Sequence, residues 1–442
     1  MPPISPTSRE TLTEKFHALL DECDTVADHA LFGQTFDDLE NFFLIQGRTF
    51  LREVLQEKLQ ERIEQTEAND TPPCHDCKKK TAIADIKPKT ILTVHGAVTI
   101  DRRYHHCSAC KKRSFPVDVT LGLPKKYSTG LQRRVARCCA LGSYRLAKDN
   151  LAELCQTHLS PTVIGNIADQ IADKMEGRLK NNPEVRRTFQ KAKGETEFYA
   201  DGTFVHIRND DGKAEWREFK VGAYAKRCRG LSAFPSEWAS RSLPEPSVVS
   251  AFAAIVDKEG FQELCQTMRR TLGVGGVSSA LGDGAKWVWN VHRAVHGTTD
   301  ECLDIYHAAE HISDCGKVLF GETQAKAEWF ERMRMILLSE GLGGMERELS
   351  LLKAGLKKSQ VKSVDSLLEY FRGNAGRLRY CERLAEGRAI GSGLIEGACK
   401  NLVGKRLKQT GACWRVGRAN KIALLSAVLY SHQWKNAWKN TH

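Results

Sequence analysis

Two Cys-x-x-Cys pairs constrain the fold of this chain more than any other feature of its sequence. Cys74 and Cys77 form the first pair, and Cys107 and Cys110 form the second. A tetrahedral Zn²⁺ site needs four soft ligands, and each Cys-x-x-Cys turn supplies two of them. The spacing therefore predicts a zinc ribbon between residues 71 and 118 that holds one structural Zn²⁺.

The stretch between the two pairs supports this prediction. It contains two β-rich runs around His95-Gly96, which is a hairpin signal. His105 and His106 are close enough in sequence to replace a cysteine ligand, although four cysteines suffice. The alternative is four unrelated buried cysteines. A redox pair is disfavoured, because there are two pairs and neither opens the helix of a βαβ unit.

The overall composition points to a polyanionic partner and to a reducing compartment. The 442 residues carry a formal net charge of +12, and such a surplus of Lys and Arg most often serves nucleic acid. No apolar run reaches the roughly 18 residues of a membrane span, and the first residues lack a signal-peptide pattern. The 15 cysteines are an odd number, which argues against a disulfide framework and favours a cytoplasmic location.

Periodicity predicts an α+β chain with several domains. Helical spacing covers residues 9–67, and three helices are expected between 129 and 180. Two strands are expected in 196–225, around the turn sequence Asn-Asp-Asp-Gly, and an α/β stretch follows up to a helix that begins near 306. Residues 321–386 read as helical, and so do 393–409 and 415–431.

The three helices after the ribbon allow two interpretations. A short link joins 143–155 to 160–180, and Ser160-Pro161 opens the latter helix as cap and first-turn residues. This spacing suits a helix-turn-helix that binds DNA. The alternative is an ordinary helical packing unit, because the last helix is not strongly basic. The first helix is more basic, and its Arg133, Arg134 and Arg137 are expected to contact DNA.

Three acidic residues stand at unusual positions. Asp201 interrupts a run that otherwise reads as a buried strand, and Asp283 follows a strand between two glycines. Glu396 lies in the first turns of a helix that follows a glycine-rich turn. A buried carboxylate is costly without a partner, and carboxylate oxygens are the ligands that Mg²⁺ prefers. Two strand-borne aspartates and a helical glutamate can hold the two metal ions that phosphoryl transfer uses.

Each acid alone has a simpler explanation, because an Asp after a strand is usually a helix cap and a helical Glu is usually solvated. The basic residues that follow Glu396 favour a phosphate-binding role for this helix. They are Lys400, Lys405, Arg406 and Lys408.

These blocks together resemble a known family. The matching stretches are YADGTFV with WREFKVGAYA, LGDGAKWVWN, DIYHAAEHI and GSGLIEGACKNLVGKRLKQTGACW. They are similar to the DDE transposases of bacterial insertion sequences, in particular the Kra-type group, whose N-terminal region is rich in Cys. The resemblance implies an RNase H-like core with Asp201, Asp283 and Glu396 as the catalytic triad. Asp304 and His307 resemble the D-x-x-H element of the distantly similar Mutator-like transposases, as supporting residues.

The resemblance also implies a layout of the chain. The expected parts are an N-terminal helical region (1–70), the zinc ribbon (71–118), a helix-turn-helix-like unit (119–190), the RNase H-like core (191–320 and 389–442) and an all-α insertion (321–388).

The activity implied is DNA cleavage and strand transfer with two Mg²⁺ ions, for which Mn²⁺ can substitute. The partners implied are the terminal inverted repeats and target DNA, bound by a dimer or higher oligomer at the bacterial nucleoid. One alternative is a domesticated or regulatory relative that binds DNA without cutting it. Another is an RNase H-like resolvase or repair nuclease, which would not need the ribbon and the long insertion.

Two further residues keep a local alternative. His307 and His311 are one helical turn apart and could bind a metal, or they could mark a simple strand-to-helix junction. Trp414 could pack the last helices together or stack on an extruded base.

Overall fold

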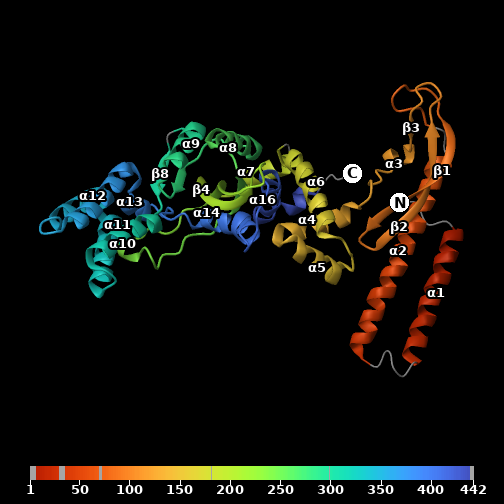
Figure 1. Cartoon of the computed structure of the whole chain (residues 1–442), viewed down its shortest axis with the longest axis horizontal. Helices are drawn as coiled ribbons and strands as arrows, with labels where there is room; N and C mark the ends of the chain where they lie inside the picture. The colour runs from red at the N-terminus through yellow and green to blue at the C-terminus, as the bar shows by residue number, and fades with distance from the viewer. Residues whose placement is uncertain (1–5, 29–34, 69–71, 181, 298, 439–442) are drawn as a thin grey trace. The chain divides into compact units, whose positions relative to one another are not determined.

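The computed structural model describes residues 6–28, 35–68, 72–180, 182–297 and 299–438. They fall into two compact units, each described by itself (Figure 1). Unit 1 comprises Met1–Cys138 with Arg145–Ile164, and unit 2 comprises Cys139–Tyr144 with Gly165–Lys439. The helical unit expected at 119–190 is therefore divided between the two. None of the described helices is long and apolar enough to cross a bilayer.

Unit 1 begins with two helices and a three-stranded antiparallel sheet. The helices are α1 (Pro6–Asp28) and α2 (Phe36–Ala68), and the strands are β1 (Ala82–Thr93), β2 (Gly96–His106) and β3 (Arg113–Ser114), in the order β1-β2-β3. The predicted hairpin is confirmed: Thr93 pairs with Gly96, whose φ of 116° suits glycine. The unit continues with α3 (Pro116–Thr120), most of α4 (Thr129–Leu141), α5 (Tyr144–Cys155) and the start of α6 (Pro161–Lys180).

Side chains of α2 hold this helix along β2. Gln56, Gln60 and Glu67 accept hydrogen bonds from the backbone N–H groups of alternate β2 residues, at 2.9, 2.8 and 2.9 Å. Beneath them Ile63 packs with apolar residues of the sheet and α3. The helix therefore satisfies backbone donors that would otherwise lack a strand partner.

Unit 2 is built on a mixed sheet in the order β6-β5-β4-β7-β8. The strands are β4 (Glu195–Arg208), β5 (Ala214–Arg227), β6 (Val248–Ala254), β7 (Ser279–Gly282) and β8 (Asp300–Leu303). The strands β4, β5 and β6 pair antiparallel, whereas β4, β7 and β8 pair parallel. The sheet thus changes from antiparallel to parallel pairing at β4, the strand that carries Asp201.

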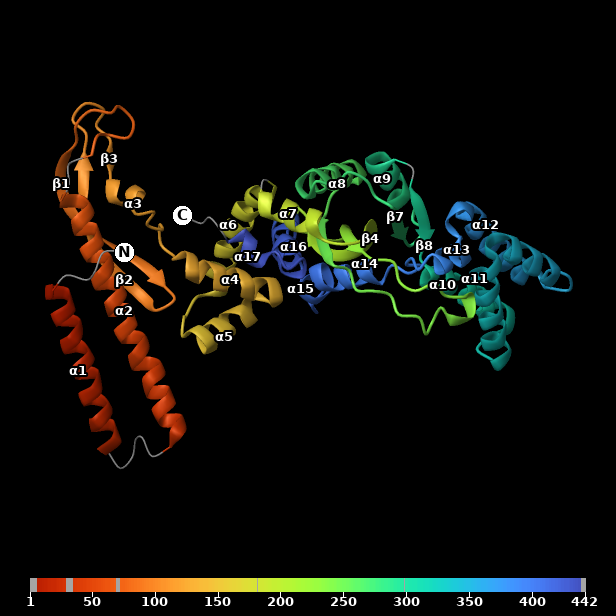
Figure 2. The same cartoon turned by 180° about the vertical axis from the view of Figure 1, so that it is seen from behind.

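Helices cover both faces of this sheet (Figure 2). On one face α7 (Pro183–Lys191), α8 (Lys258–Leu272) and α9 (Lys286–His296) enclose a core that includes Phe189, Phe198 and Phe261. On the other side are α14 (Gly393–Ala398), a π-helical segment (Cys399–Gly404), α15 (Lys405–Leu407) and α16 (Val416–Tyr430), followed by α17 (Trp434–Ala437). The side chain of Ser431 accepts a hydrogen bond from Ala251 of edge strand β6, and that of Asn420 accepts one from Ile255, the residue after this strand.

The expected helical stretch lies between β8 and α14. It comprises α10 (Ile305–Phe320), α11 (Gln324–Leu352), α12 (Lys358–Gly373) and α13 (Tyr380–Ala385). The helix α11 has a break at Gly341, whose φ is 60°. The sequence did not predict β6, and it placed β8 two residues too late. Asp304 ends that strand because it already caps α10.

Candidate metal centre and catalytic site

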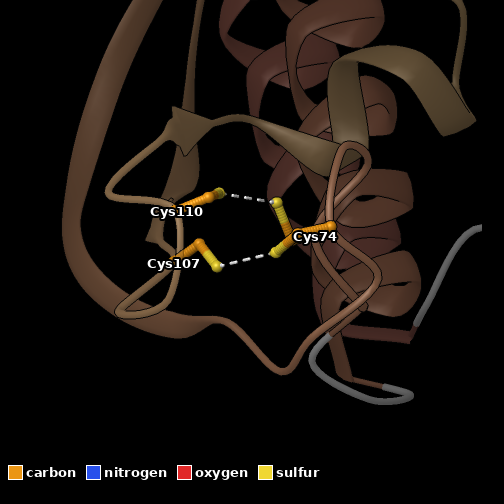
Figure 3. A group of neighbouring side chains, drawn as sticks. Cys74, Cys107 and Cys110 are labelled. Carbon is orange, nitrogen blue, oxygen red and sulfur yellow. Dashed lines mark hydrogen bonds between the residues drawn. The ribbon is translucent and has the colours of Figure 1, made fainter.

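The four predicted zinc ligands converge in unit 1. Their sulfur atoms all lie within 4.8 Å of one another, and Cys74–Cys110 and Cys77–Cys107 are both 3.5 Å apart. Figure 3 shows Cys74, Cys107 and Cys110 directed toward one centre. A tetrahedral ion with Zn–S distances of about 2.3 Å would place its sulfurs about 3.8 Å apart. The donors therefore fit a structural Zn²⁺, and the cluster is consistent with a zinc ribbon.

The two cysteine turns have the same backbone geometry. Lys78 and Lys111 each lie four residues after the first cysteine of their turn, with φ of 59° and 60°. The N–H of Cys74 donates to Lys79, and that of Cys107 donates to Lys112 in the same way. Backbone N–H groups aimed at sulfur, first that of Cys110, lower the pKa of Cys107 to about 6. Burial and the neighbouring sulfurs instead raise the pKa of Cys110, so without a metal the cluster favours the thiolate at Cys107 and the thiol at Cys110.

In unit 2 the strand register places three aspartates in one row. Tyr199 of β4 pairs with Leu281 of β7, and Leu281 pairs with Cys302 of β8. Two residues beyond each of these positions stand Asp201, Asp283 and Asp304. Neighbouring strands lie about 4.8 Å apart, so the row crosses the carboxyl ends of β7 and β8 and the middle of β4, where the pairing of β4 with β7 ends. This edge is where α/β sheets bind their ligands.

Asp201 is half-buried and engaged at both carboxylate oxygens. Oδ1 accepts from the N–H of Gly202 at 2.6 Å, and Oδ2 accepts from the thiol of Cys399 at 3.5 Å. Burial raises the pKa of Asp201, and the charge of Asp283 raises it further. The ionised form of Asp201 is thus destabilised in the absence of a cation.

Asp283 and Glu396 reach the same region from different elements. Asp283 accepts a hydrogen bond from the N–H of Ala285 at 2.9 Å, in the glycine-flanked turn before α9. Glu396 is exposed in α14. Although its side chain is exposed, the surrounding protein removes part of the solvent from the Glu396 carboxylate and so raises its pKa, and the charges of Asp304 and then Asp201 add to the effect. The acids therefore interact electrostatically.

Among the residues that the structure describes, the four cysteines are the one group of three or more such ligands whose donor atoms all lie within 4.8 Å. The carboxylates of Asp201, Asp283 and Glu396 thus do not meet at one point. An arrangement that uses them would hold a cation between pairs of acids.

Asp304 is fully buried, and both of its carboxylate oxygens accept hydrogen bonds from backbone N–H groups. Oδ1 accepts from the N–H groups of Tyr306 and His307 at 2.6 and 3.1 Å, and Oδ2 accepts from that of Ser392. The N–H of Asp304 donates to Gly282 at 2.9 Å. Asp304 therefore joins the end of β7, the start of α10 and the turn that leads to Glu396. Its role is to position these segments.

His307 is half-buried and lies among the acids. Its Nδ1 is 3.2 Å from Glu310, and its charge would lower the pKa of both Asp201 and Glu396. His311, the other member of the possible metal pair, stacks on Tyr370 with ring centroids 3.7 Å apart. Burial lowers the pKa of His311.

The basic residues after Glu396 divide into two classes. Lys400, Lys405 and Lys408 are exposed, and Lys408 donates to Thr203, two residues beyond Asp201. Arg406 is instead 1% exposed, so the expectation that it contacts DNA is wrong for this conformation. Its Nε donates to the carbonyl of Cys139 at 2.8 Å.

Aromatic rings account for the burial of Arg406. Its guanidinium lies 4.9 Å from the ring of Tyr144 and 4.6 Å from that of Trp414. Trp414 therefore packs within unit 2, and its Nε1 donates to Leu407 at 3.1 Å.

The other residues expected to bind DNA lie on α4. Arg133, Arg134 and Arg137 are all exposed, and none forms an ion pair in the described part of the chain. The candidate recognition helix α6 differs, because Asp169 and Asp173 pair with Arg418 and Lys421 of α16. These ion pairs are what the packing-unit alternative expects.

Sequence reasoning missed Cys399 as a neighbour of Asp201. It lies three residues after Glu396 and therefore on the same face of the helix, which is the signal that could have found it.

A search of curated proteins gave no match. A model of an uncharacterised protein family, UPF0236, matches residues 32–222, which include the four cysteines and Asp201 but neither Asp283 nor Glu396. Over this segment, which is less than half of the chain, the protein is similar to the uncharacterised family UPF0236.

Proposed function

We propose that this protein is a DDE transposase that cuts DNA at the ends of an insertion sequence and joins them to target DNA. The observation that carries the proposal is the row formed by Asp283 and Asp304, which follow β7 and β8, and Asp201, which lies in β4 just beyond its pairing with β7. Glu396 is electrostatically coupled to this row from α14. A mixed sheet with acids at this edge fits the RNase H-like core that the resemblance implies.

The donor set fits magnesium. Burial and the charge of Asp283 raise the pKa of Asp201, and burial with the charges of Asp304 and Asp201 raises that of Glu396, so a hard cation would stabilise this site. Asp201 would be the shared ligand, with Asp283 and Glu396 on either side. When bound, two Mg²⁺ ions activate the attacking oxygen and stabilise the leaving one. The three carboxylates do not meet at one point. This agrees with the assignment, because each ion would need only a pair of them.

Other residues have supporting roles in this proposal. Asp304 holds the turn before Glu396, and His307 compensates part of the negative charge of the acids. Lys408, held beside Asp201 by Thr203, is suited to contact a backbone phosphate. The zinc ribbon and the exposed arginines of α4 would bind the ends of the element, on an oligomer that acts at the bacterial chromosome in the cytoplasm.

The test is an incubation of purified, zinc-loaded protein with duplex DNA that carries the ends of its own element. With Mg²⁺ or Mn²⁺ we expect a specific nick at the end and then joining to a target plasmid. Chelation of the divalent ion should stop both reactions. Binding of the ends without any cleavage under these conditions would support the non-catalytic DNA-binding relative instead.

A further inference from the structure

A second positively charged feature lies in unit 2, away from the acids. A depression with a volume of about 350 Å³ is formed by α7, the end of α8 and the segment that follows it. Arg186, Arg269 and Arg270 line it together with Gln266, and no carboxylate does. Arg270 and Arg186 are exposed, and Arg269 is half-buried.

Backbone carbonyls hold two of these arginines in place. Arg269 donates to three carbonyl groups, those of Val274, Gly275 and Val295, at 3.2, 2.9 and 2.5 Å. Arg186 donates through Nη2 to the carbonyl of Arg270 at 2.6 Å. The guanidinium groups are thus positioned before any ligand arrives, which lowers the entropic cost of binding.

Gly273 allows this close packing. Its φ is 66°, and a Cβ atom there would lie 2.6 Å from Nε2 of Gln190 and 3.1 Å from Nε of Arg186. A larger residue would displace the side chains that line the depression.

The charge in the depression is not compensated by the protein. In the part of the chain that the structure describes, none of the three arginines forms an ion pair, whereas Arg187 on the same helix pairs with Glu184 at 3.1 Å. Positive charge at the C-terminal end of α8 also interacts favourably with the helix dipole. This interaction accounts only for Arg269, because its N–H groups donate to backbone carbonyls. Arg270 donates through Nη2 only to Thr267, at 3.2 Å, and keeps other donors for a ligand.

We propose that this depression binds a backbone phosphate of duplex DNA. Guanidinium groups recognise phosphate oxygens through paired hydrogen bonds. A nucleic-acid backbone fits better than a small free anion, because the exposed Lys191 and Lys193 extend the positive surface beyond the depression. The choice of duplex DNA rests on the proposed function.

The distance to the acids suits such a duplex. Val274 precedes β7, and Asp283 follows it, so the depression and the acids lie at opposite ends of this strand. Nine residues of chain span at most about 30 Å, which is less than the roughly 35 Å of one turn of B-DNA. A duplex cut at the acids is therefore long enough to reach the depression within about one helical turn.

The experiment measures binding of a duplex of arbitrary sequence, about 30 base pairs or three helical turns long, to full-length zinc-loaded protein over a range of salt concentrations. Arg270→Gln should reduce the slope of log affinity against log salt by about 1, and Arg186→Gln with Arg270→Gln should reduce it by about 2. Arg372→Gln is the matched control, because it removes one exposed charge from α12, where Arg372 pairs with Glu346.

Equal slopes for Arg270→Gln and Arg372→Gln would overturn the inference. The inference would also be overturned if Arg270→Gln changed only the competition by inorganic phosphate and left the salt slope unaltered. That result would assign the depression to a small anion. An unchanged melting temperature of Arg270→Gln shows that the fold is intact, and we expect this because its side chain bonds only Thr267. A smaller salt slope of Arg270→Gln, found for a protein whose wild type cleaves no DNA, would support phosphate binding by the depression. It would at the same time contradict the proposed catalytic function.

Discussion

At the level of single residues, Arg406 shows that one residue of a basic stretch of sequence can be buried and stabilise the fold while its lysine neighbours are exposed. Its guanidinium lies between two aromatic rings and bonds a backbone carbonyl, so it stabilises unit 2. We expect Arg406→Ala to lower the free energy of unfolding by about 2–4 kcal/mol, because it leaves a cavity and an unpaired carbonyl.

The neighbouring Lys405→Ala is the matched control. Lys405 is exposed and bonds only Asn401, so stability should change by less than about 0.5 kcal/mol. If Lys405 contacts phosphate, its loss reduces the salt slope of DNA binding by about 1. Denaturant titration and DNA binding of both variants separate the two roles. Equal stability of Arg406→Ala and wild type would contradict the structural role of Arg406.

His292 makes the stability of unit 2 depend on pH. It is fully buried beneath the sheet, and burial lowers its pKa from 6.5 to about 4. In the unfolded chain it binds a proton below pH 6.5, whereas the folded chain resists protonation until about pH 4. His292 therefore does not lower the free energy of unfolding above pH 6.5. Between pH 6.5 and 4 this free energy falls, by about 2 kcal/mol at pH 5.

A zinc ion held by the four cysteines would also be released in acid and would itself make stability depend on pH, so wild type and a His292 variant are compared at each pH. The difference in unfolding free energy between wild type and His292→Gln should change by about 2 kcal/mol between neutral pH and about pH 5. A difference that stays constant with pH would show that His292 does not resist protonation in the folded state.

At the level of elements, the zinc ribbon depends on its two matched turns. Cys107→Ser with Cys110→Ser removes half of the ligands and should abolish the binding of about one zinc per chain. We expect β1–β3 to unfold while unit 2 remains folded, because its core contains no residue of the ribbon. Zinc analysis and proteolysis of the variant check both expectations. Full zinc content in the variant would refute the assignment of these ligands.

Elements differ in how well their sequence predicts them. The four-cysteine cluster and the hairpin follow from local signals, namely the Cys-x-x-Cys spacing and Gly96, and the structure contains both. The strand β6 has no such signal, because its run of small apolar residues fits a helix or a strand equally well. Only its pairing with β5 and the side-chain caps from α16 define it.

At the level of the whole molecule, long-range pairing creates the candidate catalytic site. The sequence indicates three acids of the right types, yet their alignment depends on the register between Tyr199 and Leu281, which no local pattern contains. The same holds for the aromatic partners of Arg406. The burial of Asp304, and hence its positioning role, also follows only from the folded arrangement.

The central claim is that Asp201 takes part in metal-dependent DNA cleavage. Asp201→Asn preserves the size and the hydrogen bond from Gly202 but removes the negative charge that a cation requires. Its single-turnover cleavage of element ends in Mg²⁺ should fall by at least about 1,000-fold, while binding of the same DNA stays within a few fold of wild type. The fold should be slightly more stable without metal, because a partly buried charge is removed. Cleavage by Asp201→Asn at the wild-type rate, with DNA binding equal to that of wild type, would contradict this account.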